Sequence, residues 1–191
     1  MQVDIDTSRI AVLADSFGAS IKQMRKAEVR ALNKTLRWVV KNIIKNIGRE
    51  AKLPAKLLRQ RIRAFKATTR NRSGRVWAGL QPLMAHRLGA VRQMKRGGVR
   101  AGRHRFDNAF VHTTSNNKLI VFQRTGEAKR LMKKGRYADT RIKREPVDKA
   151  KLDLHTSDVQ KVVNEWFGKA QAQFFIVFKR ELNYEVFVKN G

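Results

Sequence analysis

The sequence of 191 residues contains no cysteine, only three prolines and no long apolar run. The lack of cysteine excludes disulfide frameworks, thiol chemistry and cysteine-based zinc sites. Because no stretch of about 18 apolar residues is present, we expect no transmembrane helix. The mildly acidic N-terminus lacks the basic region and apolar core of a secretory signal peptide, so we expect none.

Acidic residues are scarce as well. The chain has 15 Asp and Glu against 43 Lys and Arg, which gives a formal net charge of +28. Residues 51–106 contain 16 basic residues and not one acidic residue. So much charge of one sign repels itself in a compact protein, and an anionic partner is expected to offset it. Nucleic acid is the first candidate for this partner, and a membrane surface is the second.

Apolar residues still make up 42% of the chain, which is enough for a hydrophobic core and argues against a wholly disordered polycation. Residues 20–47 carry apolar side chains every three or four positions, a pattern that predicts a long amphipathic helix. We expect Ser20 as its N-cap and Gly48 as its C-terminal cap. Pro54 then lies in the first turn of a shorter helix, and the helical part extends to residue 66.

A second long helix is predicted over residues 157–183, where Ser157 and Gln160 have the spacing of a capping box. Its apolar face is bulky, and further apolar side chains lie off that face. One side is therefore expected to join the core, and the other side to contact a partner subunit. The candidate oligomer contacts are Phe174, Phe175 and Phe178.

Between the helices, residues 67–150 are predicted to be rich in β-strand and basic loops. A β-hairpin is predicted where residues 110–114 and 119–123 flank the polar, turn-forming residues 115–117. Shorter strands are expected at 75–80 and 86–92. A second basic loop is expected at 126–141, and a short edge strand containing Pro146 at 142–147.

Residues 91–106 read VRQMKRGGVRAGRHRF and hold six cations without an acid. Because the stretch lies between predicted strands, we interpret it as a basic loop. Contact with phosphates needs only cations on one surface, and few aromatic side chains are available for base stacking. The loop could therefore touch the DNA backbone without sequence preference, touch an acidic neighbouring subunit, or simply be solvated. The candidate contact residues are Arg92, Lys95, Arg96, Arg100, Arg103 and Arg105.

Catalytic patterns are missing from this basic stretch and from the rest of the sequence. The glycines at 97 and 98 are not followed by the GK[ST] of a phosphate-binding loop, and no nucleophile elbow is present. His104 and Asp107 are close in sequence, but an ordinary loop histidine explains them better than an acid–base pair. No metal site, cofactor or enzymatic activity is predicted.

Longer motifs resemble a known family. The helix carries ALNKTLRWVVKNIIKNIGREAKLPAKLLRQRI, the basic stretch continues as GRHRFDNAFV, and the hairpin ends in VFQRTGEAKR before REPVDKAK. Together these segments, which span nearly the whole chain, resemble the minor tail protein Z family of tailed phages and prophages, also called tail completion proteins.

The resemblance implies a virion structural protein with an α+β fold in a single domain, residues 1–191. Long N-terminal and C-terminal helices would pack on a small, mainly antiparallel sheet with extended basic loops. The protein would form a ring, for which we expect six copies, at the head-proximal end of the tail. It would reside in the virion neck, and in the host cytoplasm during assembly.

The resemblance also implies the partners. They are further copies of the chain, the tail terminator and tail tube proteins, the head–tail connector and, by nonspecific backbone contact, genomic DNA in the channel. No membrane partner is expected. The alternative hypothesis is a sequence-nonspecific nucleic-acid-binding protein of a phage or bacterium. That protein would bind DNA or RNA tightly on its own, with a steep dependence on salt.

Overall fold

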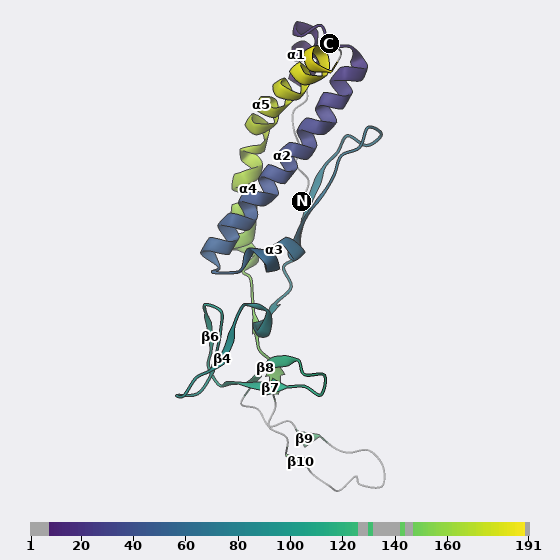
Figure 1. Cartoon of the computed structure of the whole chain (residues 1–191). Coiled ribbons are helices and arrows are strands. Elements are labelled where there is room, and N and C mark those ends of the chain that lie inside the picture. Colours follow the sequence, from purple (N-terminus) through teal and green to yellow (C-terminus); the bar gives the residue numbers. More distant parts are fainter. Residues whose placement is uncertain (1–7, 126–129, 132–141, 144–146, 190–191) are drawn as a thin grey trace. The chain divides into compact units, whose positions relative to one another are not determined.

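The computed structural model describes residues 8–125, 130–131, 142–143 and 147–189 (Figure 1). The chain divides into two compact units: unit 1 is Met1–Leu80 with His155–Gly191, and unit 2 is Gln81–Leu154. Long helices and small antiparallel sheets confirm the α+β class. The single-domain organisation expected from the sequence stays a prediction.

Unit 1 is built on one long helix, α2 (Ile21–Glu50). Ser20 caps its N-terminus as predicted, because the Ser20 hydroxyl accepts from the Gln23 amide and the Gln23 side chain accepts from the Ser20 amide. The prediction that Gly48 ends the helix is wrong, since the helix continues to Glu50 and is capped by Ala51. A Cβ on Gly48 would lie 3.2 Å from the Leu53 carbonyl oxygen, so this glycine allows the chain to fold back closely.

The C-terminal segment runs beside α2 (Figure 1). It forms two helices, α4 (Thr156–Gly168) and α5 (Ala170–Asn183), where the sequence predicted one. The predicted Ser157 cap is also wrong, because α4 begins one residue earlier, after His155. Trp38 of α2 meets Trp166 of α4 edge to face, with ring centroids 5.2 Å apart. A short helix, α1 (Ser8–Ser16), adds Ile10 to the same core.

Three buried carboxylates of unit 1 are each paired with a cation. Glu28 of α2 lies 3.1 Å from Arg72, Glu181 of α5 pairs with Lys34, and Glu185 pairs with Arg30. Glu185 lies in the final turn of π-helix, Tyr184–Val188, where the sequence pattern was ambiguous between helix and strand. Buried carboxylates need such partners because an unpaired charge in a protein interior is costly.

After α2 the chain forms α3 (Ala55–Arg61) and then a hairpin of β1 (Ile62–Phe65) and β2 (Arg75–Ala78). The prediction of helix to residue 66 is therefore wrong beyond Arg61, while the predicted strand at 75–80 is confirmed as β2. Apolar residues at 57, 58, 62 and 65 suit a helix locally. Antiparallel pairing with β2 makes residues 62–65 a strand.

The hairpin lies along α2 and is fastened to it at three points. The side chain of Asn33 donates to the Ala67 carbonyl at 3.0 Å and accepts from the Ala67 amide at 2.9 Å. The second point is the ion pair of Arg72 with buried Glu28. The third is Gly74, where any Cβ would collide with Leu36 of α2. The hairpin therefore has one fixed inner face and one fixed outer face.

Unit 2 contains the predicted hairpin as β7 (Ala109–Thr113) and β8 (Leu119–Arg124), with Thr114–Lys118 hydrogen bonds closing the turn. β11 (Val147–Lys149) pairs with the other edge of β8. β3 (Leu83–Met84) pairs with β12 (Lys151–Leu152), and β3 is followed by the short helix η1 (Ala85–Arg87).

A further strand pair joins β9 (Arg130–Leu131) to β10 (Ile142–Lys143). β10 and β11 overlap the two ends of the strand predicted at 142–147, and Pro146 lies outside the described residues. Most of the basic loop predicted at 126–141 also lies outside them. None of the described helices combines the length and apolar character needed to cross a membrane.

Candidate anion-binding surface

The basic stretch of unit 2 is a three-stranded antiparallel sheet, not the loop that the sequence predicted. Its strands are β4 (Val91–Gln93), β5 (Val99–Ala101) and β6 (His104–Phe106). Each strand has only three residues, which is too short for a clear alternating pattern. The strand predicted at 86–92 is correspondingly displaced, because residues 85–87 form η1.

The two faces of this sheet differ completely. Val99, Ala101 and Phe106 are buried on one face. On the opposite face Arg92 lies directly across from Arg100, and Arg100 lies directly across from Arg105. All three arginines are exposed, so they form one rung of cations across the sheet. Neighbouring strands are about 4.8 Å apart, so the Cα atoms of the three arginines lie within about 10 Å of one another.

Like charges directly opposite one another destabilise a sheet. Among the described residues, the rung has one ion pair to offset this cost, between Arg105 and Asp107, whose atoms lie 2.8 Å apart. Both side chains of that pair are well exposed, so its contribution to stability is small. The rung is thus a surface on which an external anion would relieve repulsion.

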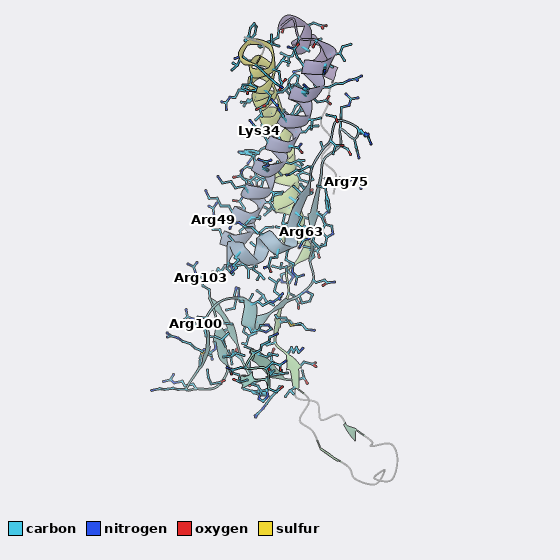
Figure 2. The ribbon with its side chains drawn as sticks, turned by 45° about the vertical axis from the view of Figure 1, so that its right-hand side comes forward. Lys34, Arg49, Arg63, Arg75, Arg100 and Arg103 are labelled. Atoms are coloured by element: carbon cyan, nitrogen blue, oxygen red, sulfur yellow. The ribbon has the colours of Figure 1, made fainter. Side chains whose placement is uncertain are left out.

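The other three predicted residues lie in the turns. Lys95 and Arg96 belong to the turn between β4 and β5, and Arg103 lies in the tight turn between β5 and β6. All three side chains are exposed. The turns lie at opposite ends of the strands, so these cations flank the rung at both ends. Figure 2 labels Arg100 of the rung and Arg103 of one turn.

The glycines of the stretch are needed for the fold of the sheet. Gly98 has φ +82, and a Cβ there would lie 2.7 Å from the Phe106 carbonyl oxygen. Gly102 has φ +58, and a Cβ there would collide with the Leu88 carbonyl oxygen. Residues other than glycine rarely adopt a backbone conformation with positive φ. The glycines therefore permit tight turns and close strand packing.

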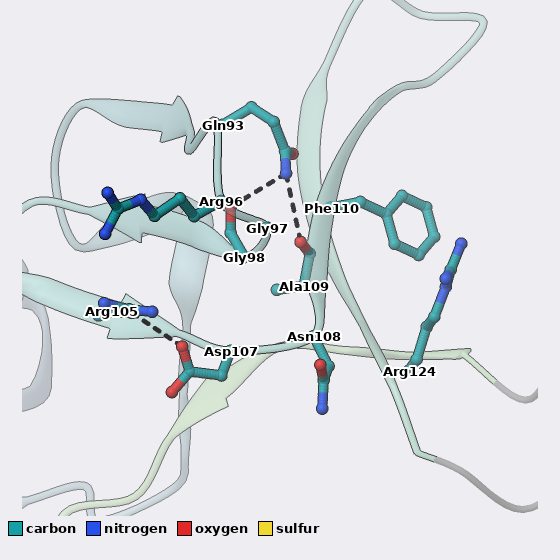
Figure 3. A pocket seen from close by; sticks show the side chains of 10 residues that line it. All are labelled: Gln93, Arg96, Gly97, Gly98, Arg105, Asp107, Asn108, Ala109, Phe110 and Arg124. Atoms are coloured by element: carbon teal, nitrogen blue, oxygen red, sulfur yellow. Dashed lines mark hydrogen bonds and ion pairs between the residues drawn. The ribbon is translucent and has the colours of Figure 1, made fainter.

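Gln93 holds the β4–β5 turn against β7. Its side-chain nitrogen donates to the Gly98 carbonyl at 2.9 Å and reaches the Ala109 carbonyl at 3.5 Å (Figure 3). Its side-chain oxygen accepts from the Val111 amide at 3.1 Å. This side chain ties the basic sheet to the β7–β8 hairpin within unit 2. The sequence contained no signal for this role.

A hollow of about 340 Å³ lies beside this junction (Figure 3). Arg96 and Arg105 contribute cations to its wall, together with the backbone at Gly97 and Gly98. Arg124 also lines the hollow, and its guanidinium lies 5.7 Å from the centre of the Phe110 ring. The hollow thus extends the cationic surface from the rung to β8, a strand that the sequence did not connect with the site.

Acid–base or metal chemistry finds little support at this surface. Asp107 is paired with Arg105 and not with His104, the partner considered from the sequence. No group of three or more His, Cys, Asp or Glu residues that could hold a metal occurs within the described part of the chain. The pKa of His86 is lowered by burial and by the nearby charges of Arg87 and Lys149. What the arrangement can do is attract and hold an anion.

The predicted oligomer contacts lie in unit 1, and two of them need correction. Phe174 and Phe178 are both 0% exposed, with stacked rings 5.8 Å apart in the core beside α2. Their burial within the chain leaves no surface for a partner. Phe175 packs at the margin of the same core and is partly exposed, so its role as a contact stays a prediction.

The chain is similar to a known protein family. A family model described as prophage minor tail protein Z matches residues 19–170, which include α2, the basic sheet and α4, and end at the first residue of α5. No curated protein matches the chain, and no solved structure matches it. The family comprises structural proteins of phage tails and is not a known class of enzyme. The match covers well over half of the chain, and we conclude that this chain belongs to the prophage minor tail protein Z family.

Proposed function

We propose that this tail protein forms a ring at the head-proximal end of the tail, where it links the tail terminator to the head connector around the DNA channel. Membership of the family supports a place in the phage tail and contacts with other tail components. The rung of Arg92, Arg100 and Arg105 supports a position at the DNA channel, because exposed arginines on one face can contact the phosphates of DNA that passes through it.

The anionic surface that fits the rung best is the phosphate backbone of duplex DNA. Backbone contact requires cations on one exposed face and no particular spacing or aromatic side chains. The exposed face of the sheet meets this description, since the residues that point outward from its strand centres are arginines. Such contact carries no sequence preference, as a channel through which a whole genome passes requires.

A ring multiplies a weak contact. Head-to-tail interfaces close into a ring when the rotation between neighbours permits it, and each subunit then presents its rung to the same axis. Six copies, the number we expect, would surround the DNA with six rungs. Binding by one isolated chain can therefore be weak while the assembled ring holds DNA in position.

The test replaces the six cations of the basic sheet with glutamine in a prophage that encodes this chain: Arg92, Lys95, Arg96, Arg100, Arg103 and Arg105. These side chains are exposed, so the fold should persist. We expect filled heads and unjoined tails to accumulate, as counted by negative-stain electron microscopy, and infectious titre to fall. A matched control replaces six exposed cations of unit 1 in the same way: Lys22, Lys41, Lys45, Lys56, Lys161 and Lys179.

Fully infectious particles from the variant of the basic sheet would contradict the proposal, as would equal defects in variant and control. Native mass spectrometry adds the assembly state. A chain that stays monomeric both alone and with head and tail proteins contradicts the ring. Tight DNA binding by the isolated monomer would favour a free nucleic-acid-binding protein.

A further inference from the structure

The β1–β2 hairpin of unit 1 presents a second surface that the proposed function does not use. In its register, Arg63 lies opposite Trp77 and Phe65 lies opposite Arg75. Opposite residues of an antiparallel pair share a face, as do residues two apart on one strand. These four side chains therefore share the outer face, and Figure 2 labels Arg63 and Arg75 on this hairpin.

Two large aromatic side chains are exposed on this outer face. Phe65 is 58% exposed and Trp77 is 49% exposed, although Ile62 and Val76 of the same strands are buried on the inner face. The inner residues thus already bury the hairpin against α2, and the packing of the hairpin does not require the two outer aromatic side chains. Exposed aromatic residues beside arginines are the composition of interface hot spots, where Trp and Arg dominate binding.

The aromatic face is held in a defined shape. The hydrogen bonds of Asn33, the Arg72–Glu28 ion pair and the close approach of Gly74 to Leu36 fix the hairpin on α2. Ordering such a surface in advance lowers the entropic cost of binding. Gly79 adds to this order, because a Cβ there would lie 2.7 Å from the Trp77 ring.

A hollow of about 590 Å³ opens on the hairpin. Phe65, Trp77 and Arg75 line it together with Lys66 and the polar side chains of Asn71 and Ser73. Its size lies in the range of pockets that take a ligand or several side chains of a partner. The wall combines apolar rings with cations, so its complement is a segment with apolar and acidic side chains.

Charge argues against a second copy of this chain as the occupant. Residues 51–106 contain no acid, so hairpin cannot pair with hairpin. The described carboxylates of Glu28, Glu181 and Glu185 in unit 1 are buried and paired, and Glu165 is paired with Lys169. The other described acids are Asp15, Glu50 and Asp158 in unit 1 and Asp107, Asp148 and Asp153 in unit 2, of which Asp107 is paired with Arg105. They are few beside the 43 Lys and Arg of the chain, so a second copy offers no surplus of negative charge.

Duplex DNA fits this surface less well than a protein does. Phosphate contact gains nothing from aromatic rings, because the bases of a duplex are stacked inside. A free β-ribbon can enter the major groove, but this ribbon lies flat on α2 and exposes one face only. We propose that the outer face of the hairpin docks an acidic, apolar-containing segment of a different virion protein, with Trp77 and Phe65 as the anchors.

This proposal is independent of the arginine rung and of the ring. The test places the photo-cross-linker p-benzoylphenylalanine at one position at a time in assembled particles, as Trp77→p-benzoylphenylalanine and Phe65→p-benzoylphenylalanine. Val12, which is 71% exposed on α1, carries the same group as the control. We expect both hairpin positions to cross-link to one peptide of a different protein in which Asp and Glu outnumber Lys and Arg, as read by mass spectrometry.

A cross-link to the same chain, a cross-link to DNA, an acid-poor peptide or no cross-link would each overturn the proposal. A second measurement covers variants that fail to enter particles. Phe65→Ala with Trp77→Ala should lower incorporation of the chain into tails by on the order of thirtyfold, as for loss of interface anchors. The matched control, Val12→Ala with Leu119→Ala, should leave incorporation unchanged.

The melting temperature of the double hairpin variant should stay close to that of the parent chain, since both removed side chains are exposed. Its binding to a duplex DNA probe should also be unchanged. Unchanged incorporation, or a parallel loss of binding to a single-stranded DNA probe, would contradict a protein partner. If the glutamine variant of the basic sheet stays fully infectious while the hairpin cross-links to an acidic peptide, the DNA contact is overturned and the docking surface is retained.

Discussion

Two small antiparallel sheets lie in the acid-free segment 51–106, one in each unit, and both bury one face and turn arginines outward on the other. In the β4–β5–β6 sheet the outward rung consists of arginines alone. In the β1–β2 hairpin each outward arginine faces an aromatic ring across the strands. Both sheets are basic, but one exposes arginines alone and the other exposes arginines with aromatic rings. This difference indicates which anionic partner each sheet fits.

The two sheets also differ in what supports them. The hairpin is fastened to α2 by hydrogen bonds, a buried carboxylate and a close backbone approach. The rung is balanced, among the described residues, by the exposed Arg105–Asp107 pair. A preformed, partly apolar surface suits docking of a protein. A surface of like charges that one exposed ion pair offsets only in part suits phosphate contact, where charge neutralisation supplies the free energy.

The largest expected effect separates the two sheets by DNA binding. Arg92→Gln, Arg100→Gln and Arg105→Gln together should lower the slope of log affinity against log salt by roughly three, because three phosphate contacts are lost. Affinity for a duplex probe at low salt should fall by at least about tenfold. Fluorescence anisotropy of a labelled duplex across salt concentrations measures both quantities.

The matched control for that triple variant removes the same charge from the hairpin, through Arg63→Gln, Lys66→Gln and Arg75→Gln. We expect a much smaller change in salt slope, because these cations flank aromatic rings on a surface assigned to a protein. Equal slopes for the two triple variants would erase the distinction between the sheets.

Much of this fold could be predicted from the sequence where local signals are strong. The Ser20 cap, the apolar stripe of α2 and the polar turn between β7 and β8 are local signals, and the structure confirms all three. The six cations of the basic sheet were also identified from composition alone, although their role stays a proposal.

The missed elements depend on contacts between distant residues. Ile62–Phe65 is a strand because it pairs with Arg75–Ala78, and the local pattern fits a helix equally well. The arginine rung arises from register across three strands of three residues, which no periodicity reveals. Phe174 and Phe178 were assigned to a partner because the sequence could not show that α2 already covers them.

A second expected effect concerns how the hairpin is seated. Gly74→Ala should destabilise unit 1 by about 1–3 kcal/mol, because the added methyl group would collide with buried Leu36. Urea unfolding followed by tryptophan fluorescence reports this unit, since Trp38, Trp77 and Trp166 all lie in it. Gly168→Ala is the control, because nothing lies within 4 Å of its added Cβ. Equal stability of both variants would show that the hairpin does not pack closely on α2.

The ion pairs of the two sheets should respond unequally. Arg72→Ala leaves the carboxylate of Glu28 buried without its partner and should cost about 1–2 kcal/mol, less than a fully buried pair because Arg72 is half exposed. Asp107→Ala breaks an exposed pair and should cost about 0.5 kcal/mol or less. Chemical unfolding followed by circular dichroism compares them. A larger loss of unfolding free energy for Asp107→Ala than for Arg72→Ala would contradict the conclusion that the hairpin is the more firmly supported of the two sheets.

The smallest expected effect is a pH dependence confined to unit 2. Burial, Arg87 and Lys149 lower the pKa of His86 below its ordinary value of 6.5. The unfolded chain then binds a proton before the folded chain does, so stability is full above about pH 6.5 and declines as pH falls below it. Hydrogen exchange of β7 and β8 amides should show this decline, and His86→Gln should remove it. If the stability of unit 2 still declined in the same way in His86→Gln as pH falls, another titrating group would be responsible for the pH dependence.

A reconstruction of the head-proximal end of the tail in DNA-filled particles tests the central claim most directly. We expect a ring of this chain in which Arg92, Arg100 and Arg105 face the DNA, while Trp77 and Phe65 lie against an acidic segment of a different protein. A ring in which the hairpin faces the DNA and protein covers the rung, or a particle neck without the chain, would contradict these two surfaces and the ring.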